Sequence, residues 1–205
     1  MTLNDMKIKV FSLIEEYYPD AAHLAEDEDV LYKINGIINS IQLDLMKYRK
    51  INANTEIDIK ENDEKLITIS DEIKDIYQIN KIILVPDKEV NRNMSTDFSM
   101  IDEDNIELPE DFVGTVKIYY YKYPKLAKVS YDEDEDQDEY DNNFKFDIDP
   151  MLLEVMPYGV ARDVLRLDMI SVYGTYFERT YNELKQGLDG RKSAGIINIY
   201  GGDDI

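Results

Sequence analysis

Residues 149–188 read DPMLLEVMPYGVARDVLRLDMISVYGTYFERTYNELKQGL, and their apolar side chains recur mostly at steps of three, four or seven. This spacing places them on one stripe, so it predicts a single long amphipathic helix whose stripe faces a core. Asp149 suits the N-cap, Pro150 the first turn, and Gly187 or Gly190 the C-terminal stop. The predicted stripe comprises Leu153, Met156, Val160, Val164, Leu167, Tyr176 or Phe177, Tyr181, Leu184 and Leu188.

Two further helical patterns occupy the N-terminal part of the chain. Apolar residues at helical spacing run from Leu3 to Tyr17 and stop before Pro19. A second such run follows the acidic residues 27–29, whose side chains suit an N-cap. Because the connection between the two runs is short, we expect a hairpin of antiparallel helices over residues 1–50.

The periodicity changes to two in the region that follows. Apolar and polar residues alternate in several short runs, and turn residues separate these runs, which indicates β-strands. The alternating runs are 56–59, 66–69 and 116–121, and Pro124 ends the last of them. Residues 81–85 form a further run that is continuously apolar and ends at Pro86. We therefore expect a small antiparallel sheet inserted between helical segments.

Composition limits the chemistry that the chain can perform. Its 205 residues include no cysteine, which excludes disulfides, thiolate nucleophiles and cysteine-bound zinc. No apolar run reaches the length of a signal peptide or a membrane-spanning helix, so we expect a soluble protein with no membrane partner. The length suits one domain with a sizeable core.

The net charge of −21 is the second strong constraint. Capture of nucleic acid requires clustered lysine and arginine, and attraction to anionic lipid requires the same sign of charge. Two roles near DNA remain compatible with this acidity, namely a decoy that imitates DNA and a channel to which DNA must not adhere. High negative charge also simply keeps a protein soluble.

Residues 132–141 contain eight acidic side chains in ten positions. Mutual repulsion predicts an extended or disordered loop here. A calcium-binding EF-hand loop needs Gly at position 6 and Glu at position 12. Counting from Asp132, those positions hold Gln137 and Asn143, and a start at Asp134 fails at the same places. We therefore predict no specific metal site.

Catalytic motifs are absent from the sequence. His23 is the only histidine, so any imidazole-based mechanism would depend on it alone. Carboxylates are numerous, but no particular pair indicates a glycosidase. The tyrosine cluster at 119–123 could stack bases or sugars, although sheet packing or a protein interface suits an alternating strand better. We expect a protein that is not an enzyme and binds no cofactor.

Arginine is scarce, so its positions near the C-terminus are informative. Arg162 and Arg166 lie one turn apart, with Asp163 beside them, and Arg179 follows further along. Pairing along the helix is one interpretation. The other is a contact between subunits, in which a basic strip of one copy meets an acidic face of the next in a ring.

Three segments resemble the head–tail connector (adaptor) proteins of tailed bacteriophages. The first is Ala161-Arg-Asp-Val-Leu165, the second is Tyr176-Phe-Glu-Arg-Thr-Tyr-Asn-Glu-Leu-Lys185, and the third runs from Leu108-Pro-Glu-Asp-Phe112 to Tyr120-Tyr-Lys-Tyr-Pro124. The resemblance covers residues 100–188, and the N-terminal helices agree with it in layout. The acidic insertion is not part of the family pattern.

The resemblance implies a structural virion protein in the neck of the particle, made in the host cytoplasm during assembly. Such subunits form a ring, usually twelvefold, beneath the portal protein, and the ring gives the tail or further neck proteins a docking surface. DNA passes through the lumen without adhering. Connectors often place a C-terminal tail against the portal, and the corresponding residues here are Ile196, Ile197, Asn198, Ile199 and Tyr200.

Three other functions stay open at this point. The first is an acidic inhibitor that imitates DNA and blocks a host DNA-binding protein. The second is a tail-completion or tail-terminator role in the same particle. The third, an enzyme acting on cell-wall glycan, would need one carboxyl group with a raised pKa in a cleft.

The expected fold class is α+β and mainly helical, with an N-terminal helix pair, a long C-terminal helix and an inserted antiparallel β subdomain. We expect a single connector-like domain, 1–205. Its parts are a helical hairpin (1–50), a β insertion (54–128), an acidic loop (129–147), a long helix (149–189) and a C-terminal docking tail (190–205).

Overall fold

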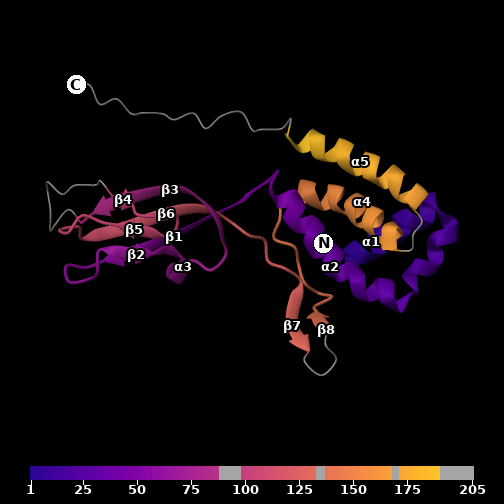
Figure 1. Ribbon diagram of the computed structural model, residues 1–205, viewed down its shortest axis with the longest axis horizontal. Helices are drawn as coiled ribbons and strands as arrows, with labels where there is room; N and C mark the ends of the chain where they lie inside the picture. Colours follow the sequence, from indigo (N-terminus) through magenta and orange to yellow (C-terminus); the bar gives the residue numbers. More distant parts are fainter. Residues whose placement is uncertain (88–97, 133–136, 168–170, 190–205) are drawn as a thin grey trace. The chain divides into compact units, whose positions relative to one another are not determined.

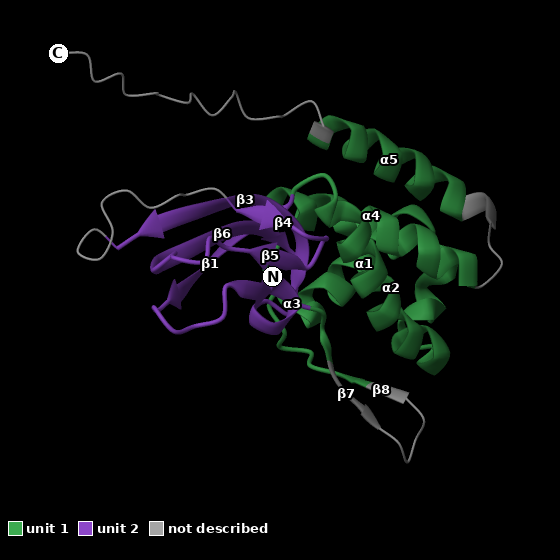
Figure 2. Cartoon of the chain, turned by 60° about the vertical axis from the view of Figure 1, so that its left-hand side comes forward, with its two compact units in different colours: residues 1–49, 126–205 green, residues 50–125 purple. Residues whose placement is uncertain are grey.

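The structure is a computed structural model, and it divides the chain into two compact units (Figure 2). One unit joins residues 1–49 to residues 126–205, and the other comprises residues 50–125. The described residues are 1–87, 98–132, 137–167 and 171–189. The fold class is α+β and mainly helical, as predicted. Each unit is described by itself below.

The first unit is a helical bundle built from both ends of the chain. Its central helix α4 packs against α1, α2 and α5 (Figure 1). The elements are α1 (Leu3–Tyr17), the 3₁₀ helix η1 (Pro19–Ala25), α2 (Glu28–Met46), α4 (Pro150–Leu167) and α5 (Ser171–Asp189), with the hairpin strands β7 (Lys128–Asp132) and β8 (Gln137–Tyr140). The core includes Leu3, Met6, Val10, Ile34, Ile38, Leu45, Met156, Val160 and Val164.

A side-chain cap starts each of the two N-terminal helices, and that of the second lies among the acidic residues 27–29 that the sequence predicts. Thr2 and Asp5 form a capping box, in which each side chain accepts a hydrogen bond from the other residue's backbone N–H. At α2, the Asp27 carboxylate accepts from the N–H groups of Asp29 and Val30 at 2.9 and 3.1 Å. The predicted helix pair is confirmed, with η1 as an additional element in its connection.

The single long C-terminal helix predicted from the stripe is wrong. The chain forms two helices, α4 and α5, which pack against each other. A straight helix would leave the aromatic rings of its second half in solvent, whereas packing α5 on α4 buries Phe177 and Tyr181 completely. Two residues of the predicted stripe, Leu167 and Leu184, are instead 41% and 37% exposed.

The predicted acidic loop contains a β-hairpin. Strands β7 and β8 pair antiparallel, with Tyr131 opposite Asp138, while residues 133–136 lie outside the described part of the chain. The hairpin base is fixed to α2, because the backbone N–H of Ala127 donates to the buried Asn39 Oδ1 at 3.1 Å. Backbone pairing and this anchor organise a segment that charge repulsion alone would keep extended.

The second unit is the antiparallel β insertion that the sequence predicts. One sheet has the strand order β1-β6-β3 and a smaller one the order β2-β5-β4. The elements are β1 (Ile51–Ile59), β2 (Leu66–Thr68), the short helix α3 (Ile69–Glu72), β3 (Ile76–Pro86), β4 (Ser99–Met100), β5 (Asn105–Glu107) and β6 (Gly114–Lys122).

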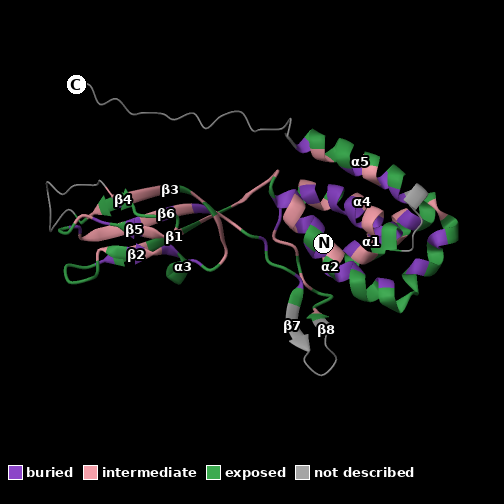
Figure 3. Ribbon diagram, viewed as in Figure 1, coloured by how far each residue is buried: buried purple, intermediate pink, exposed green. Residues whose placement is uncertain are grey.

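The central strand β6 separates a core face from an outer face. Val116, Ile118 and Tyr120 are buried in the core of this unit, together with Ile106 and Phe112 (Figure 3). Successive side chains of a strand point to opposite faces of the sheet. The alternate residues of β6, among them two tyrosines, therefore lie on the outer face, as the alternation in the sequence predicts.

Gly114→Ala is expected to lower the free energy of unfolding by about 1 to 3 kcal/mol. Gly114 has a φ of 149°, and a Cβ placed there would lie 2.2 Å from the carbonyl oxygen of Val85. Gly36→Ala is the matched control, because a Cβ there meets nothing closer than 3.9 Å and alanine favours a helix. Urea unfolding measures both, and equal stabilities of the two variants would contradict the strained conformation at Gly114.

Candidate functional site

Arg162 and Asp163 pair with each other inside the helical unit. The guanidinium of Arg162 donates two hydrogen bonds to the Asp163 carboxylate, at 2.7 and 2.6 Å. It also lies over the Tyr181 ring, with Cζ 5.0 Å from the ring centroid. The Arg162 side chain is only 16% exposed, and its hydrogen bonds to Asp163 raise its pKa. The structure therefore shows pairing within the chain for this residue.

The other two arginines that the sequence singles out also have carboxylate partners in their own chain. Arg166 lies 3.5 Å from Asp163 and 3.0 Å from Glu178 of α5. Arg179 pairs with Glu183 one turn further along α5, and its side chain is 81% exposed. Of the three guanidiniums, that of Arg179 is the most available to another subunit.

The predicted docking tail, Ile196 to Tyr200, lies outside the described residues. His23 lies on η1 and is exposed, with its Nδ1 3.0 Å from the backbone oxygen of Asp20.

A polar network that the sequence pattern does not indicate connects α2 to α5. The Tyr181 hydroxyl donates to Asp44 Oδ2 at 2.9 Å, and Lys185 Nζ donates to the same oxygen at 2.6 Å. The Lys185 ammonium also lies over the rings of Tyr48 and Tyr181, at 5.1 and 4.8 Å from their centroids. In the sequence Asp44 looks like an ordinary surface acid of a helix, so no local signal could have identified its role.

The network raises the pKa of Tyr181 and lowers the pKa of Asp44. Burial, followed by the charge of Asp44 and its hydrogen bond, raises the pKa of Tyr181 well above its usual range. Burial also pulls the pKa of Asp44 upward, but the hydrogen bonds from Lys185 and Tyr181 outweigh it, so the net pKa is lowered. The carboxylate is thus held in its charged form.

Asp44→Asn is expected to lower the free energy of unfolding by about 1 to 2 kcal/mol at neutral pH. Because the pKa of Asp44 is lower in the folded than in the unfolded state, its contribution is present above about pH 4 and disappears as the pH falls through the folded pKa. Urea unfolding at neutral and acidic pH measures this difference.

Glu183→Gln is the control, because a solvent-exposed ion pair such as that with Arg179 adds little to stability. A difference between wild type and Asp44→Asn that stays constant with pH would contradict the lowered pKa.

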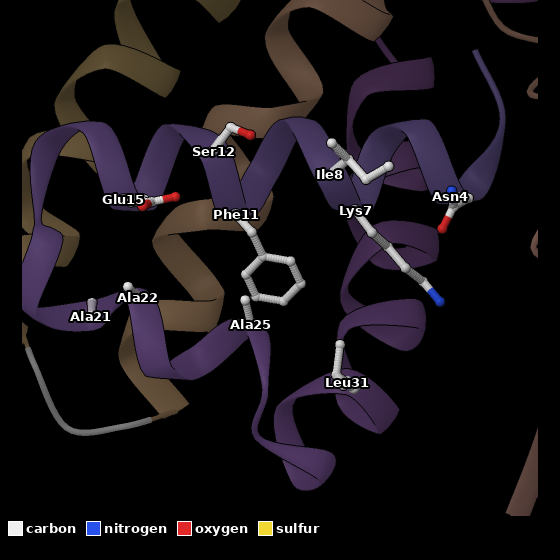
Figure 4. Close-up of a pocket in the computed structure, with 10 residues that line it drawn as sticks. All are labelled: Asn4, Lys7, Ile8, Phe11, Ser12, Glu15, Ala21, Ala22, Ala25 and Leu31. Atoms are coloured by element: carbon white, nitrogen blue, oxygen red, sulfur yellow. The ribbon is translucent and has the colours of Figure 1, made fainter.

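A groove of about 360 Å³ lies on the helical unit between α1, η1 and the start of α2. Figure 4 shows the Phe11 ring directed toward Ala25, with Lys7 and Asn4 at one end and Glu15 at the other. Ile8 and Leu31 are exposed beside it. The groove therefore suits apolar side chains flanked by one anionic and one cationic group.

Lys7 gives one end of this groove its polar character. Its Nζ donates to Asn142 Oδ1 at 2.9 Å, and burial lowers its pKa. The hydrogen bond orients the ammonium toward the segment that follows the hairpin. The stem of the lysine is left to line the groove.

A second candidate surface lies on the outer face of the β unit. Lys50 Nζ lies 4.6 Å from the ring centroid of Tyr121 and 5.6 Å from that of Tyr77, and it donates to Gln78 Oε1 at 2.6 Å. The ring of Tyr123 meets that of Tyr77 edge-on, at 5.2 Å between centroids. The sequence indicates Tyr121 and Tyr123, but neither Tyr77 nor the lysine that lies over the rings of Tyr77 and Tyr121.

A pocket of about 480 Å³ adjoins this cluster at Tyr77 and Gln78. It is also lined by Met100 and Glu103 of the segment that carries β4. The aromatic cluster is therefore bordered by a hollow rather than by a flat surface.

Comparison with known proteins does not place the chain in a family. No protein-family model matches it, and no curated protein matches it either. Within the described ranges, no helix has both the length and the apolar character needed to cross a membrane. The same residues contain no group of three or more histidine, aspartate or glutamate side chains placed to hold a metal ion.

Proposed function

We propose that this protein is a head–tail adaptor of a tailed bacteriophage. In this role it is a structural virion protein that forms a ring of identical subunits beneath the portal. The ring gives the tail or further neck proteins their docking surface. The observation that carries the proposal is the layout of the fold, in which both ends of the chain build a helical unit and the segment between them forms an antiparallel β unit. This is the layout that the connector resemblance of residues 100–188 implies.

The charge of the chain supports the proposal independently of the resemblance. DNA entering or leaving a capsid passes through such a ring, and carboxylates that face the lumen repel its phosphates. The net charge of −21 supplies them in excess. We expect part of this charge to line the channel of the assembled ring, and a neutral or basic lumen would contradict the proposal.

The exposed apolar side chains support a role in protein contacts. On the helical unit they include Ile8 and Leu31 at the groove, and the stacked pair Tyr17 and Tyr176, whose ring centroids are 4.7 Å apart. Aromatic side chains at a surface are typical of protein interfaces. The groove and the stacked pair are therefore candidate contacts with the portal, the tail or a neighbouring subunit.

Co-expression with the portal protein of the same genome, followed by electron microscopy of negatively stained particles, tests the proposal. We expect portal rings that carry an added collar of density. A chain lacking residues 196–205 then tests the C-terminal docking tail, because loss of the collar in that variant alone would assign portal docking to those residues. A collar bound to assembled tails instead of portals would support the tail-completion role.

Bare portal rings beside free subunits would contradict the adaptor proposal and favour the DNA-mimic inhibitor. That alternative predicts binding to a basic DNA-binding protein with an affinity that falls steeply as salt is raised. The same preparation of protein serves both measurements.

A further inference from the structure

The three-stranded sheet β1-β6-β3 has two edges, and the edge formed by β1 is open. All nine residues of β1 pair with β6 on one side, without a bulge. In the described part of the chain, no other hydrogen bond reaches the backbone of residues 51–59. The backbone groups of successive residues point to alternate sides of a strand. Every second residue of β1 therefore presents an unused N–H and C=O at the edge.

Strand β1 also lacks the features that protect an edge strand. Prolines, lysines and bulges hinder the pairing of an edge with another chain. The opposite edge, β3, has all three, because two register shifts interrupt its pairing with β6 and it contains Lys81 and Pro86. Strand β1 is regular and contains neither proline nor lysine. Of the two edges, that of β1 is therefore the one suited to take up a further strand.

The core-facing side chains of β1 are incompletely covered. Ala53 and Ile57 pack against the core of the β unit but remain half-buried. Val116, which lies opposite Ile57 on the central strand β6, is 0% exposed. A strand on the second side of β1 would cover Ala53 and Ile57 further. The open edge thus leaves apolar surface uncovered as well as backbone groups.

The sequence of β1, Ile-Asn-Ala-Asn-Thr-Glu-Ile-Asp-Ile, is complementary to itself when two copies run antiparallel. If Thr55 of one copy lies opposite Thr55 of another, Asn52 faces Asp58 and Asn54 faces Glu56. Each acid of the strand is then opposite an amide, whose N–H groups can donate to the carboxylate oxygens. No acid lies opposite an acid in this register.

The same register matches the core-facing side chains. Ile51 lies opposite Ile59, Ala53 lies opposite Ile57, and Thr55 lies opposite itself. Cross-strand pairs of β-branched residues and paired threonines stabilise antiparallel strands. The numbers of opposed residues differ by an even number in every pair. Residues whose backbone groups point outward therefore meet one another, and the two edges can form a continuous ladder.

Other registers of the two strands fit less well. A shift by two residues in one direction places Glu56 opposite Glu56 of the second copy, which is repulsive. The same shift in the other direction leaves Asp58 and Ile59 beyond the end of the partner strand. A shift by one residue would turn core-facing side chains toward the outer face. The register centred on Thr55 is therefore preferred.

The two acids of β1 have partners on β6 that limit repulsion at the edge. Glu56 pairs with Lys117 at 2.6 Å, and Asp58 accepts from the Thr115 hydroxyl at 2.8 Å. Each contact uses one carboxylate oxygen, so the second oxygen can accept from an amide of another copy. The net charge of −21 still opposes the approach of two copies at long range, and salt screens this repulsion.

We propose that β1 of one copy pairs antiparallel with β1 of a second copy, in the register centred on Thr55. The two three-stranded sheets then form one sheet of six strands. The contact is isologous, because the same strand takes part from both copies. It joins two copies only, whereas a ring requires a head-to-tail contact. The inference therefore goes beyond the adaptor proposal and concerns the free protein.

Sedimentation equilibrium of the wild-type chain measures the association. We expect a monomer–dimer equilibrium whose affinity rises with salt, because salt screens the repulsion between two acidic chains. A chain that stays monomeric up to about 1 mM overturns the inference and leaves the edge to a segment of another protein. A series of larger oligomers also overturns it, because an isologous contact stops at two copies.

Substitutions that change charge test the register. Asn54→Asp places an acid opposite Glu56 of the second copy, twice in each dimer, and is expected to weaken the dimer about tenfold. Asn54→Lys is expected to strengthen it. Asn80→Asp and Asn80→Lys are the matched controls, because Asn80 is exposed on β3 and the charge changes equally. Equal effects at the two positions overturn the inference. Circular dichroism checks that each variant is folded.

Cross-linking identifies the strand that occupies the edge. The chain has no cysteine of its own, so each engineered thiol is unique. In the proposed register, residue 54 of one copy lies about 7 to 8 Å from residue 54 of the other. We expect a short bis-maleimide to link the Asn54→Cys protein into dimers and to leave the Asn80→Cys protein monomeric. Links between the two proteins in a mixture would instead show a contact between β1 and β3 and overturn the inference.

None of these measurements includes the portal. Loss of the dimer therefore leaves the adaptor proposal standing, and the absence of a collar on portal rings leaves the β1 contact standing.

Discussion

Tyr181→Ala is expected to lower the free energy of unfolding of the helical unit by about 3 to 5 kcal/mol. The ring is completely buried between α5 and α4, and its hydroxyl donates to Asp44. Alanine removes the ring, leaves a cavity beside Gly159 and deprives Asp44 of one of its hydrogen bonds. Urea unfolding, followed by the helical signal in circular dichroism, measures the loss.

Tyr176→Ala is the matched control on the same helix. Its ring is partly exposed and stacks on Tyr17, so its removal is expected to cost no more than about 1 kcal/mol. Tyr181→Phe separates packing from hydrogen bonding, and we expect it to cost about 1 to 2 kcal/mol. Equal losses for Tyr181→Ala and Tyr176→Ala would mean that α5 does not pack on α4 as described.

Ile106→Ala is expected to lower the free energy of unfolding of the β unit by about 2 to 5 kcal/mol. Ile106 is 0% exposed and lies in the middle of β5, in the same core as Phe112 and Ile118. The truncation leaves a cavity in that core, because close-packed neighbours relax only in part. Native-state hydrogen exchange of the backbone amides of β5 and β6 measures the loss in this unit.

Ile101→Ala provides the control for the β unit, because Ile101 is 58% exposed just after β4. We expect it to change the stability by less than about 0.5 kcal/mol. The same loss for both isoleucines would contradict the placement of β5 at the centre of the small sheet.

The elements that local patterns define could be predicted closely. The caps at Thr2 and Asp27 and the alternation along β6 depend on neighbouring residues. The sequence indicated the cap at Asp27 and the alternation, and the structure confirms both. The end of α4 could not be predicted in this way. An apolar stripe fits one long helix and two shorter packed helices equally well, and Gly159 makes room for Tyr181 only once α5 lies against it.

At the candidate surfaces too, the sequence indicated individual residues but not the contacts that they make. The sequence indicated the tyrosines of β6, the acidic segment 132–141 and the scarce arginines. It could not show that Arg162 pairs with its neighbour Asp163 and lies against the Tyr181 ring, or that Lys50 lies over Tyr121. It likewise could not indicate that Asn39, a helical amide, fixes the base of the hairpin.

The sequence by itself determined the class of the fold, the inserted β segment, the lack of cysteine chemistry and the strong negative charge. These follow from composition and from periodicities of two and 3.6 residues, which are properties of the local chain. Only the tertiary structure decided the packing of α5 on α4, the Asp44 network and the position of Lys50 over the Tyr121 ring. Each of these depends on residues far apart in the chain, such as Asp44 and Tyr181, and no local pattern encodes their contact.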